Sequence, residues 1–185
     1  MKVGSKHYKK RWLVPTLVIV GIIAFLVLPF FSWLIGEDTL TATSDAQFCV
    51  TCHSMEPFEQ AHEADVHGGN NNHGVRAGCA DCHLPHDNSF NYMMVKAETG
   101  IHDLWVENFG DPENVDWEAG REHREDYTYD SGCLSCHTSL ETATMATNKA
   151  LIAHKPYFAG EIDDQCTTCH KHVGHANLSD YISQN

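Results

Sequence analysis

Eight cysteines stand out in this sequence of 185 residues, because all of them occur in four copies of one short pattern. The pattern is Cys-x-x-Cys-His, and its cysteine pairs are Cys49 and Cys52, Cys79 and Cys82, Cys133 and Cys136, and Cys166 and Cys169. Two thiols three residues apart lie on one turn of chain and can bond the two vinyl groups on one edge of a porphyrin. The next residue, a histidine, can then place an imidazole nitrogen on the iron. This pattern is typical of covalent c-type haem attachment.

Three other interpretations of paired cysteines are isolated redox motifs, zinc sites and disulfides. Zinc would combine Cys-x-x-Cys pairs into tetrahedral sets and would not require a histidine directly after each pair. Disulfides usually space cysteines less regularly. Because no cysteine is left over and a histidine follows every pair, we expect four covalently attached haems c.

The N-terminus has the features of a membrane anchor. Residues 1–11 are basic and contain no acid, and residues 12–35 form an uncharged run of 24 residues rich in Val, Ile, Leu and Phe. A membrane-spanning helix needs about 20 such residues, whereas the apolar region of a cleaved secretory signal is shorter, about 7–15 residues. We therefore expect an uncleaved transmembrane helix over 12–35, with Pro15 and Pro29 near its two ends.

The charge distribution indicates the orientation and the compartment. The basic segment 1–11 should stay in the cytoplasm by the positive-inside rule, which places residues 36–185 outside that membrane. In a bacterium this is the periplasm, so the expected location is the inner (cytoplasmic) membrane with a single pass. All 25 acidic residues follow Ile35, and this acidity argues against nucleic acid as a partner, since that would require basic patches.

The exported part is expected to be mainly α-helical, with little or no sheet and with the haems as its core. Its motifs group into two dihaem modules, over residues 49–83 and 133–170, separated by a longer insert. No segment has the composition of an ordinary apolar core. We expect short helices wrapped around the haems.

One helix is predicted in detail, from about Ser89 to Phe109. Asp87, Asn88 or Ser89 can cap its start, and Gly110 followed by a proline can end it. One face is largely apolar at helical spacing: Phe90, Met93, Met94, Ala97, Ile101, Leu104, Trp105 and Asn108.

A second stripe of the same helix carries charge. Lys96 and Asp103 are two turns apart and point the same way, with Gly100 between them leaving room for a flat molecule. The plainer interpretation of Lys96 and Asp103 is two solvated charges on a surface helix. Glu107 lies one turn beyond Asp103, and replacing it is expected to have little effect.

Taken together, these features resemble the NapC/NirT family of membrane tetrahaem quinol dehydrogenases, and most closely its NrfH-like branch. The similarity covers the anchor, the four haem motifs and several local signatures. These signatures are Cys-His-Ser-Met at 52–55, Cys-Ala-Asp-Cys-His-Leu-Pro at 79–85, Lys96-Ala97-x-x-Gly100-x-x-Asp103, and Cys-His-x-x-Val-x-His ending at His175.

The resemblance implies roles for residues around the first haem. In the NrfH-like branch the iron ligand is a methionine two places after the motif histidine, here Met55, and His53 is left unligated. The residue matching Asp103 blocks the other side of that iron. The residue matching Lys96 lines the quinol pocket beside it.

The other haems take histidines. Each uses its motif histidine, here His83, His137 and His170, and needs one more ligand. The resemblance matches His67 and His175 to distal ligands. His154 matches an additional histidine of the NapC-like branch, whereas in the NrfH-like branch a partner lysine can serve the second haem. Residues 68–78, with two glycines and three asparagines, are expected to form a flexible loop.

The resemblance also implies the activity. The chain is expected to oxidise quinol, with menaquinol as the expected form, taken from the membrane quinone pool, and to pass electrons through four haems to a periplasmic terminal reductase, such as a nitrite reductase, in a hetero-oligomeric complex. An alternative is a quinone reductase carrying electrons from a periplasmic dehydrogenase into the pool. A self-sufficient reductase of small oxyanions is disfavoured, because the exported domain has few lysines and arginines.

Overall fold

The structure is a computed structural model that describes residues 6–182, with the side chains of residues 6–11, 34 and 113 outside the description. The chain divides into two units, Met1–Thr43 and Ser44–Asn185. The predicted basic segment 1–11 therefore lies outside the described residues, apart from the backbone of residues 6–11.

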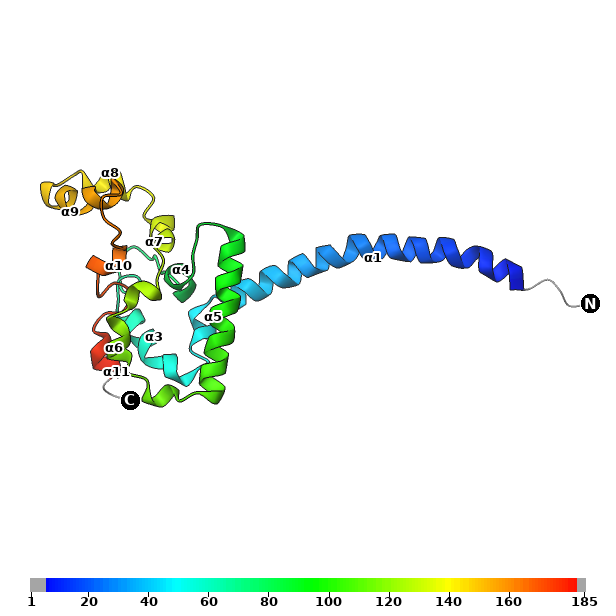
Figure 1. Ribbon diagram of the computed structural model, residues 1–185, viewed down its shortest axis with the longest axis horizontal. Coiled ribbons are helices and arrows are strands. Elements are labelled where there is room, and N and C mark those ends of the chain that lie inside the picture. The colour runs from blue at the N-terminus through cyan, green and yellow to red at the C-terminus, as the bar shows by residue number, and fades with distance from the viewer. Residues whose placement is uncertain (1–5, 183–185) are drawn as a thin grey trace, which may run out of the picture. The chain divides into compact units, whose positions relative to one another are not determined.

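The described part of the first unit is almost entirely one gently curved helix, α1, over Lys6–Ala42 (Figure 1). Its segment Trp12–Ala42 is long and apolar enough to cross a membrane, with a mean hydropathy of 2.7. The helix continues past the predicted end of the span at residue 35. Pro15 and Pro29, expected near the two ends of the span, lie inside the helix.

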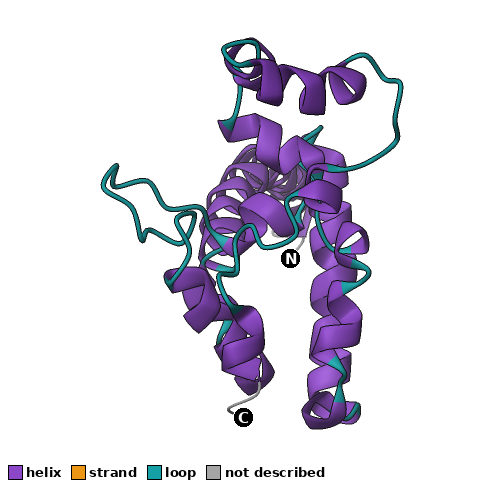
Figure 2. Ribbon diagram, turned by 90° about the vertical axis from the view of Figure 1, so that its left-hand side faces the viewer, coloured by secondary structure: helices purple, strands orange, loops and turns teal. Residues whose placement is uncertain are grey.

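The second unit consists of short helices and loops, and no strand occurs in the part of the chain that is described (Figure 2). This confirms the expected mainly α-helical class. The elements are α2 (Ala46–Cys49), η1 (His53–Met55), α3 (Glu56–Glu63), α4 (Cys79–His83), α5 (Ser89–Phe109), η2 (Pro112–Asn114), α6 (Trp117–Arg121), η3 (Arg124–Asp126), α7 (Asp130–Cys136), α8 (Leu140–Thr144), α9 (Asn148–Phe158), α10 (Cys166–Cys169) and α11 (Leu178–Ile182).

The longest helix of this unit, α5, begins and ends where the sequence predicts. Its N-cap is Asn88, whose side chain accepts a hydrogen bond from the Asn91 amide. At the other end, a Cβ on Gly110 would lie 2.6 Å from the carbonyl oxygen of Val106, so a glycine allows the chain to leave the helix. An N-cap side chain at one end and a glycine at the other thus mark the limits of α5.

The second unit has almost no apolar core of its own. Among the described residues, the buried hydrophobic side chains are Ala46, Ala61, Leu84 and Leu178. A soluble unit of this size normally buries many more Leu, Ile, Val and Phe side chains. The small core fits the expectation that prosthetic groups fill the interior.

Close backbone contacts hold the short helices together. A Cβ on Gly132 in α7 would lie 2.1 Å from the carbonyl oxygen of Asp81 in α4, so these helices touch through their backbones. The Ala176 amide, just before α11, donates to the carbonyl of Ala61 in α3 at 3.1 Å. Helices α8 and α9 lie at one end of the unit, and α3, α6 and α11 at the other (Figure 1).

Candidate functional site

The four Cys-x-x-Cys-His motifs all lie on short helical segments. The second and fourth coincide with α4 and α10, the third is the last turn of α7, and the first joins the end of α2 to η1. One turn of helix places two thiols three residues apart on the same side. The eight cysteines are all free thiols, so every motif has the thiol pair that haem attachment requires.

Contacts between thiols place the motifs in sequential order. A hydrogen bond with Cys79 lowers the pKa of the Cys49 thiol to about 7, and one with Cys166 lowers that of Cys133 to about 7. The first motif therefore adjoins the second, and the third adjoins the fourth.

The second motif also adjoins the third. Burial raises the pKa of the Cys82 thiol to about 11, and the thiols of Cys133 and Cys136 add to the effect. The amide of Tyr129, at the start of α7, donates to the Cys82 carbonyl at 3.1 Å. Each motif thus adjoins the next one in the sequence.

Three motif histidines each lie beside a second histidine outside their own motif. The ring centroids are 6.2 Å apart for His83 and His175, 6.2 Å for His137 and His67, and 6.0 Å for His170 and His154. An imidazole nitrogen lies about 2 Å from a coordinated metal, with the ring centre about 1 Å behind it, so two axial imidazoles place their centroids about 6 Å apart. All three spacings therefore fit an iron ion between the rings.

Hydrogen bonds orient several of these rings in the way that metal-binding histidines need. The Nδ1 of His83 lies 2.7 Å from the Tyr127 carbonyl, that of His175 lies 3.0 Å from the Phe58 carbonyl, and that of His154 lies 2.9 Å from the Ala150 carbonyl. When Nδ1 donates to such an acceptor, Nε2 is left as the metal-binding nitrogen.

His175 is also held in the neutral form that binds metals. Burial lowers the pKa of its ring to about 4, and the neighbouring His83 acts in the same direction. The ring is therefore uncharged at pH 7, as a metal ligand must be.

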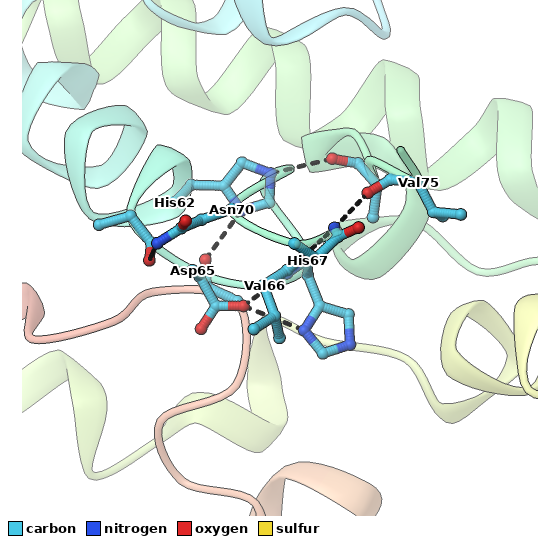
Figure 3. Close-up of polar contacts among 10 residues, drawn as sticks. His62, Asp65, Val66, His67, Asn70 and Val75 are labelled. Carbon is cyan, nitrogen blue, oxygen red and sulfur yellow. Dashed lines mark hydrogen bonds and ion pairs between the residues drawn. The ribbon is translucent and has the colours of Figure 1, made fainter. Parts of the chain in front are cut away.

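His67 has a different acceptor. Its backbone amide and its Nδ1 both lie near Oδ1 of Asp65, at 2.8 and 3.0 Å (Figure 3). The loop that follows, expected to be flexible, is braced by its asparagines: the Asn71 side chain donates to the carbonyls of Val66 and Val75 at 2.7 Å each. A cavity of about 330 Å³ lies between the segment 65–67 and the segment 169–173.

His62 shows which histidines are unsuited to metal binding. It is only 5% exposed, and its two ring nitrogens lie 2.8 Å from the Gly174 carbonyl and 2.9 Å from the Ala77 carbonyl (Figure 3). Both nitrogens are therefore occupied by backbone oxygens. His62 joins the segment before the second motif to the segment that carries His175.

The first motif is built differently. The His53 side chain is 82% exposed, and its Nδ1 lies 3.4 Å from the carboxylate of Glu56. Among the described residues, no ring contact joins His53 to another histidine. Met55, two residues after this histidine, is the last residue of the single turn η1 and is half-buried.

Helix α5 lies against this first motif. The hydroxyl of Ser54 donates to Glu107 at 2.9 Å, so Glu107, where replacement is expected to matter little, contacts the residue next to the first motif. Lys96 Nζ donates to the Ser44 hydroxyl, which also lies 3.0 Å from the Tyr92 hydroxyl.

The two charged residues singled out on α5 both act on the first-motif thiols. Burial raises the pKa of the Cys52 thiol, and the charges of Glu107 and Asp103 add to the effect. Burial lowers the pKa of the Lys96 ammonium, while the Cys49 thiol opposes that change. A Cβ on Gly100, between Lys96 and Asp103, would meet nothing within 4 Å, so the stripe has open space at this position.

The apolar face of α5 is exposed in the second unit. The large side chains on it are between 52% and 76% exposed: Phe90, Met93, Met94, Ile101, Leu104 and Trp105. A contiguous exposed apolar surface of this kind usually marks an interaction site. Here it borders the open stripe at Gly100.

The sequence did not predict the residues that hydrogen-bond to motif residues or candidate ligands, or to their immediate neighbours. Asp65, Glu107 and Asp130 are examples, the last accepting hydrogen bonds from the Tyr157 hydroxyl at 2.6 Å and from the Cys166 amide at 2.8 Å. The Asp-x-His spacing at Asp65 is a signal that was present in the sequence. Glu107 and Asp130 gave none.

Comparison with known proteins identifies the family of this chain. Residues 7–180 match the NapC/NirT cytochrome c family, N-terminal region. The chain belongs to this family. Membership confirms the prediction of a membrane-anchored, haem-binding electron-transfer cytochrome.

Several named members of the family are similar to the chain. The cytochrome c-type protein TorC of Escherichia coli is 32% identical over 180 residues, which cover 89% of this chain and 43% of TorC. The denitrification system component NirT of Stutzerimonas stutzeri is 30% identical over 89% of this chain and 83% of NirT. The tetraheme c-type cytochrome CymA of Shewanella oneidensis is 29% identical over 89% of this chain and 91% of CymA. No solved structure matches the chain.

Proposed function

We propose that the chain binds four haems c, one at each motif, and that its own histidines supply both axial ligands to three of them. The ligand pairs are His83 with His175, His137 with His67, and His170 with His154. The three ring spacings of 6.0 to 6.2 Å carry this proposal. A pair at each of these motifs leaves no position for a partner's lysine, and the use of His154 follows the NapC-like ligand pattern.

At the first motif the proposed ligand is Met55. Its support is the resemblance, together with the exposure of His53 and the lack of a facing histidine among the described residues. A bound haem supplies a one-electron acceptor at each motif, and a methionine ligand tends to raise its potential. Because each motif adjoins the next one in the sequence, we take the first and the fourth as the two ends of the electron path.

The proposed reaction is quinol oxidation at the open stripe of α5. A quinol loses two electrons and two protons. Lys96 and Asp103 hold the quinol hydroxyls and take up or relay these protons, as positioned acid–base groups do. Gly100 leaves space for the ring. The exposed apolar residues beside it, such as Met93 and Leu104, suit the hydrocarbon tail of a membrane quinone such as menaquinol.

The expected partner is a periplasmic terminal reductase that takes electrons from the fourth-motif end. In this arrangement α1 anchors the chain in the inner membrane and the haem unit faces the periplasm. The similarity to NirT, which is named as a denitrification system component, supports a role in a respiratory chain of this kind.

The proposed quinol site is tested with Lys96→Leu and Asp103→Leu in the full-length haem-loaded protein. Each change should slow haem reduction by a menaquinol analogue by about 10²- to 10⁴-fold, the usual contribution of positioned acid–base groups. Reduction by dithionite, which needs no quinol site, should still reach all four haems.

Glu98→Leu is the matched control, because Glu98 lies on an exposed part of the same helix. Its quinol-driven rate should equal that of the wild type. Unchanged rates in both Lys96→Leu and Asp103→Leu would show that this face of α5 does not line the quinol site.

A further inference from the structure

Asp65 stands out among the groups that hold the axial histidines. Its carboxylate oxygen Oδ1 accepts hydrogen bonds from both the backbone amide and the ring Nδ1 of His67 (Figure 3). The His67 ring in turn faces His137 at 6.2 Å. Asp65 therefore acts on the third-motif site through one ring.

The carboxylate is fixed and shielded from water. Asp65 is only 8% exposed. Its amide donates to the His62 carbonyl at 2.9 Å, and its carbonyl accepts from the amides of Gly68 and Asn70 at 3.1 Å each. A Cβ on Gly68 would lie 1.7 Å from the His62 carbonyl oxygen, so only a glycine lets this turn close.

The acceptor used by His67 differs in charge from those of three other axial histidines. His83, His154 and His175 each have a backbone carbonyl beside Nδ1. A hydrogen bond to a carboxylate is charge-assisted and stronger than one to a neutral carbonyl. It draws the Nδ1 proton away and makes the ring a more basic ligand. A more electron-rich ligand favours ferric over ferrous iron.

We propose that Asp65 is a positioning residue that lowers the reduction potential of the third-motif haem by polarising His67. This inference rests on the proposed ligation by His67. Because the third motif lies between the second and the fourth, the effect falls in the middle of the electron path, where the N-terminal module meets the C-terminal one. Asp65 thus sets the reduction potential of a haem in the middle of the path, which electrons must cross in either direction.

The experiment is a potentiometric titration of the full-length haem-loaded protein, followed by low-temperature EPR. Asp65→Asn keeps the shape of the side chain and an oxygen acceptor but removes the charge. It should shift one of the four midpoint potentials to a more positive value and leave the other three unchanged. The shifted haem should be the one whose low-spin signal disappears in His67→Ala.

Glu63→Gln is the control for a general charge effect. Glu63 belongs to the same segment and carries the same charge, but its carboxylate pairs with Arg76 at 3.7 Å instead of a histidine ring. Its four potentials should match those of the wild type.

Several results would overturn the inference. They are unchanged potentials in Asp65→Asn, an equal shift of all four haems, an equal shift in Glu63→Gln, or a new high-spin haem showing that Asp65 only holds the ring in place. If His67→Ala instead keeps every low-spin signal, the proposed ligand pair itself fails, and with it this inference. If His67→Ala loses a low-spin signal but Asp65→Asn shifts no midpoint potential, ligation by His67 stands and only the role of Asp65 fails.

Discussion

The three later motifs and the first motif surround their histidines in opposite ways. His83, His137 and His170 each face a second imidazole at 6.0 to 6.2 Å, whereas His53 is 82% exposed and lies beside Glu56. In the proposed ligation the later motifs are closed sites, in which the chain itself provides an imidazole on both sides of the iron. The first is an open site, bordered by the charged stripe and the exposed apolar face of α5.

Under the proposed function, this difference corresponds to two tasks. A closed site with two fixed imidazoles favours electron transfer without substrate binding, because no coordination position is free. An open site beside Lys96 and Asp103 can admit a substrate. The predictions below test whether the distal histidines occupy the second iron position at the later motifs. They also test whether the properties of the first motif depend on its contact with α5.

The largest effect is expected from removing a distal histidine. His154→Ala should convert the fourth-motif haem from low-spin to high-spin, so that one bis-histidine signal disappears from the EPR spectrum. His73→Ala, in the exposed loop, is the matched control and should leave the spectrum unchanged. A fully low-spin His154→Ala protein would show that another group closes this site.

A smaller effect is expected where the two modules meet. Gly132→Ala places a Cβ 2.1 Å from the Asp81 carbonyl oxygen, so α7 must move away from α4. Such overpacking should lower the free energy of unfolding by about 2 kcal/mol, measured by thermal unfolding of the haem-loaded protein. Gly120→Ala, with nothing within 4 Å, should not destabilise the protein. Equal stability of both variants would contradict the tight contact.

The smallest effect is expected at the open site. Ser54→Ala removes the hydrogen bond to Glu107 and should cost about 1 kcal/mol of stability, seen as a lower unfolding midpoint. The same change should weaken binding of quinol analogues slightly, since the bond joins the first motif to α5. Ser54→Thr keeps a hydroxyl and should recover most of both properties. A Ser54→Thr protein as impaired as Ser54→Ala would point to packing instead.

Local chemistry made part of this architecture predictable. The cap at Asn88 and the glycine at Gly110 located α5, and the repeated motif located the cysteines, because both features depend on residues close in sequence. The same spacing placed Lys96, Gly100 and Asp103 on one open stripe.

Long-range contacts were not predictable from residue patterns. His83 and His175 lie on α4 and near α11, and only the folded chain brings them together. The contact of Glu107 was not predicted for the same reason, since its partner Ser54 is 53 residues away. For the proposed axial histidines, only the resemblance pointed to His67, His154 and His175. The structure adds which motif histidine each of them faces.

The most direct measurement is the low-temperature EPR and magnetic circular dichroism of the wild-type, full-length, haem-loaded protein. Three haems should give bis-histidine signals, and one should differ, with high-spin or methionine-type character. Met55→His should move that one signal towards a bis-nitrogen form. Four bis-histidine signals in the wild type would contradict the open first site and, with it, the division of tasks between the motifs.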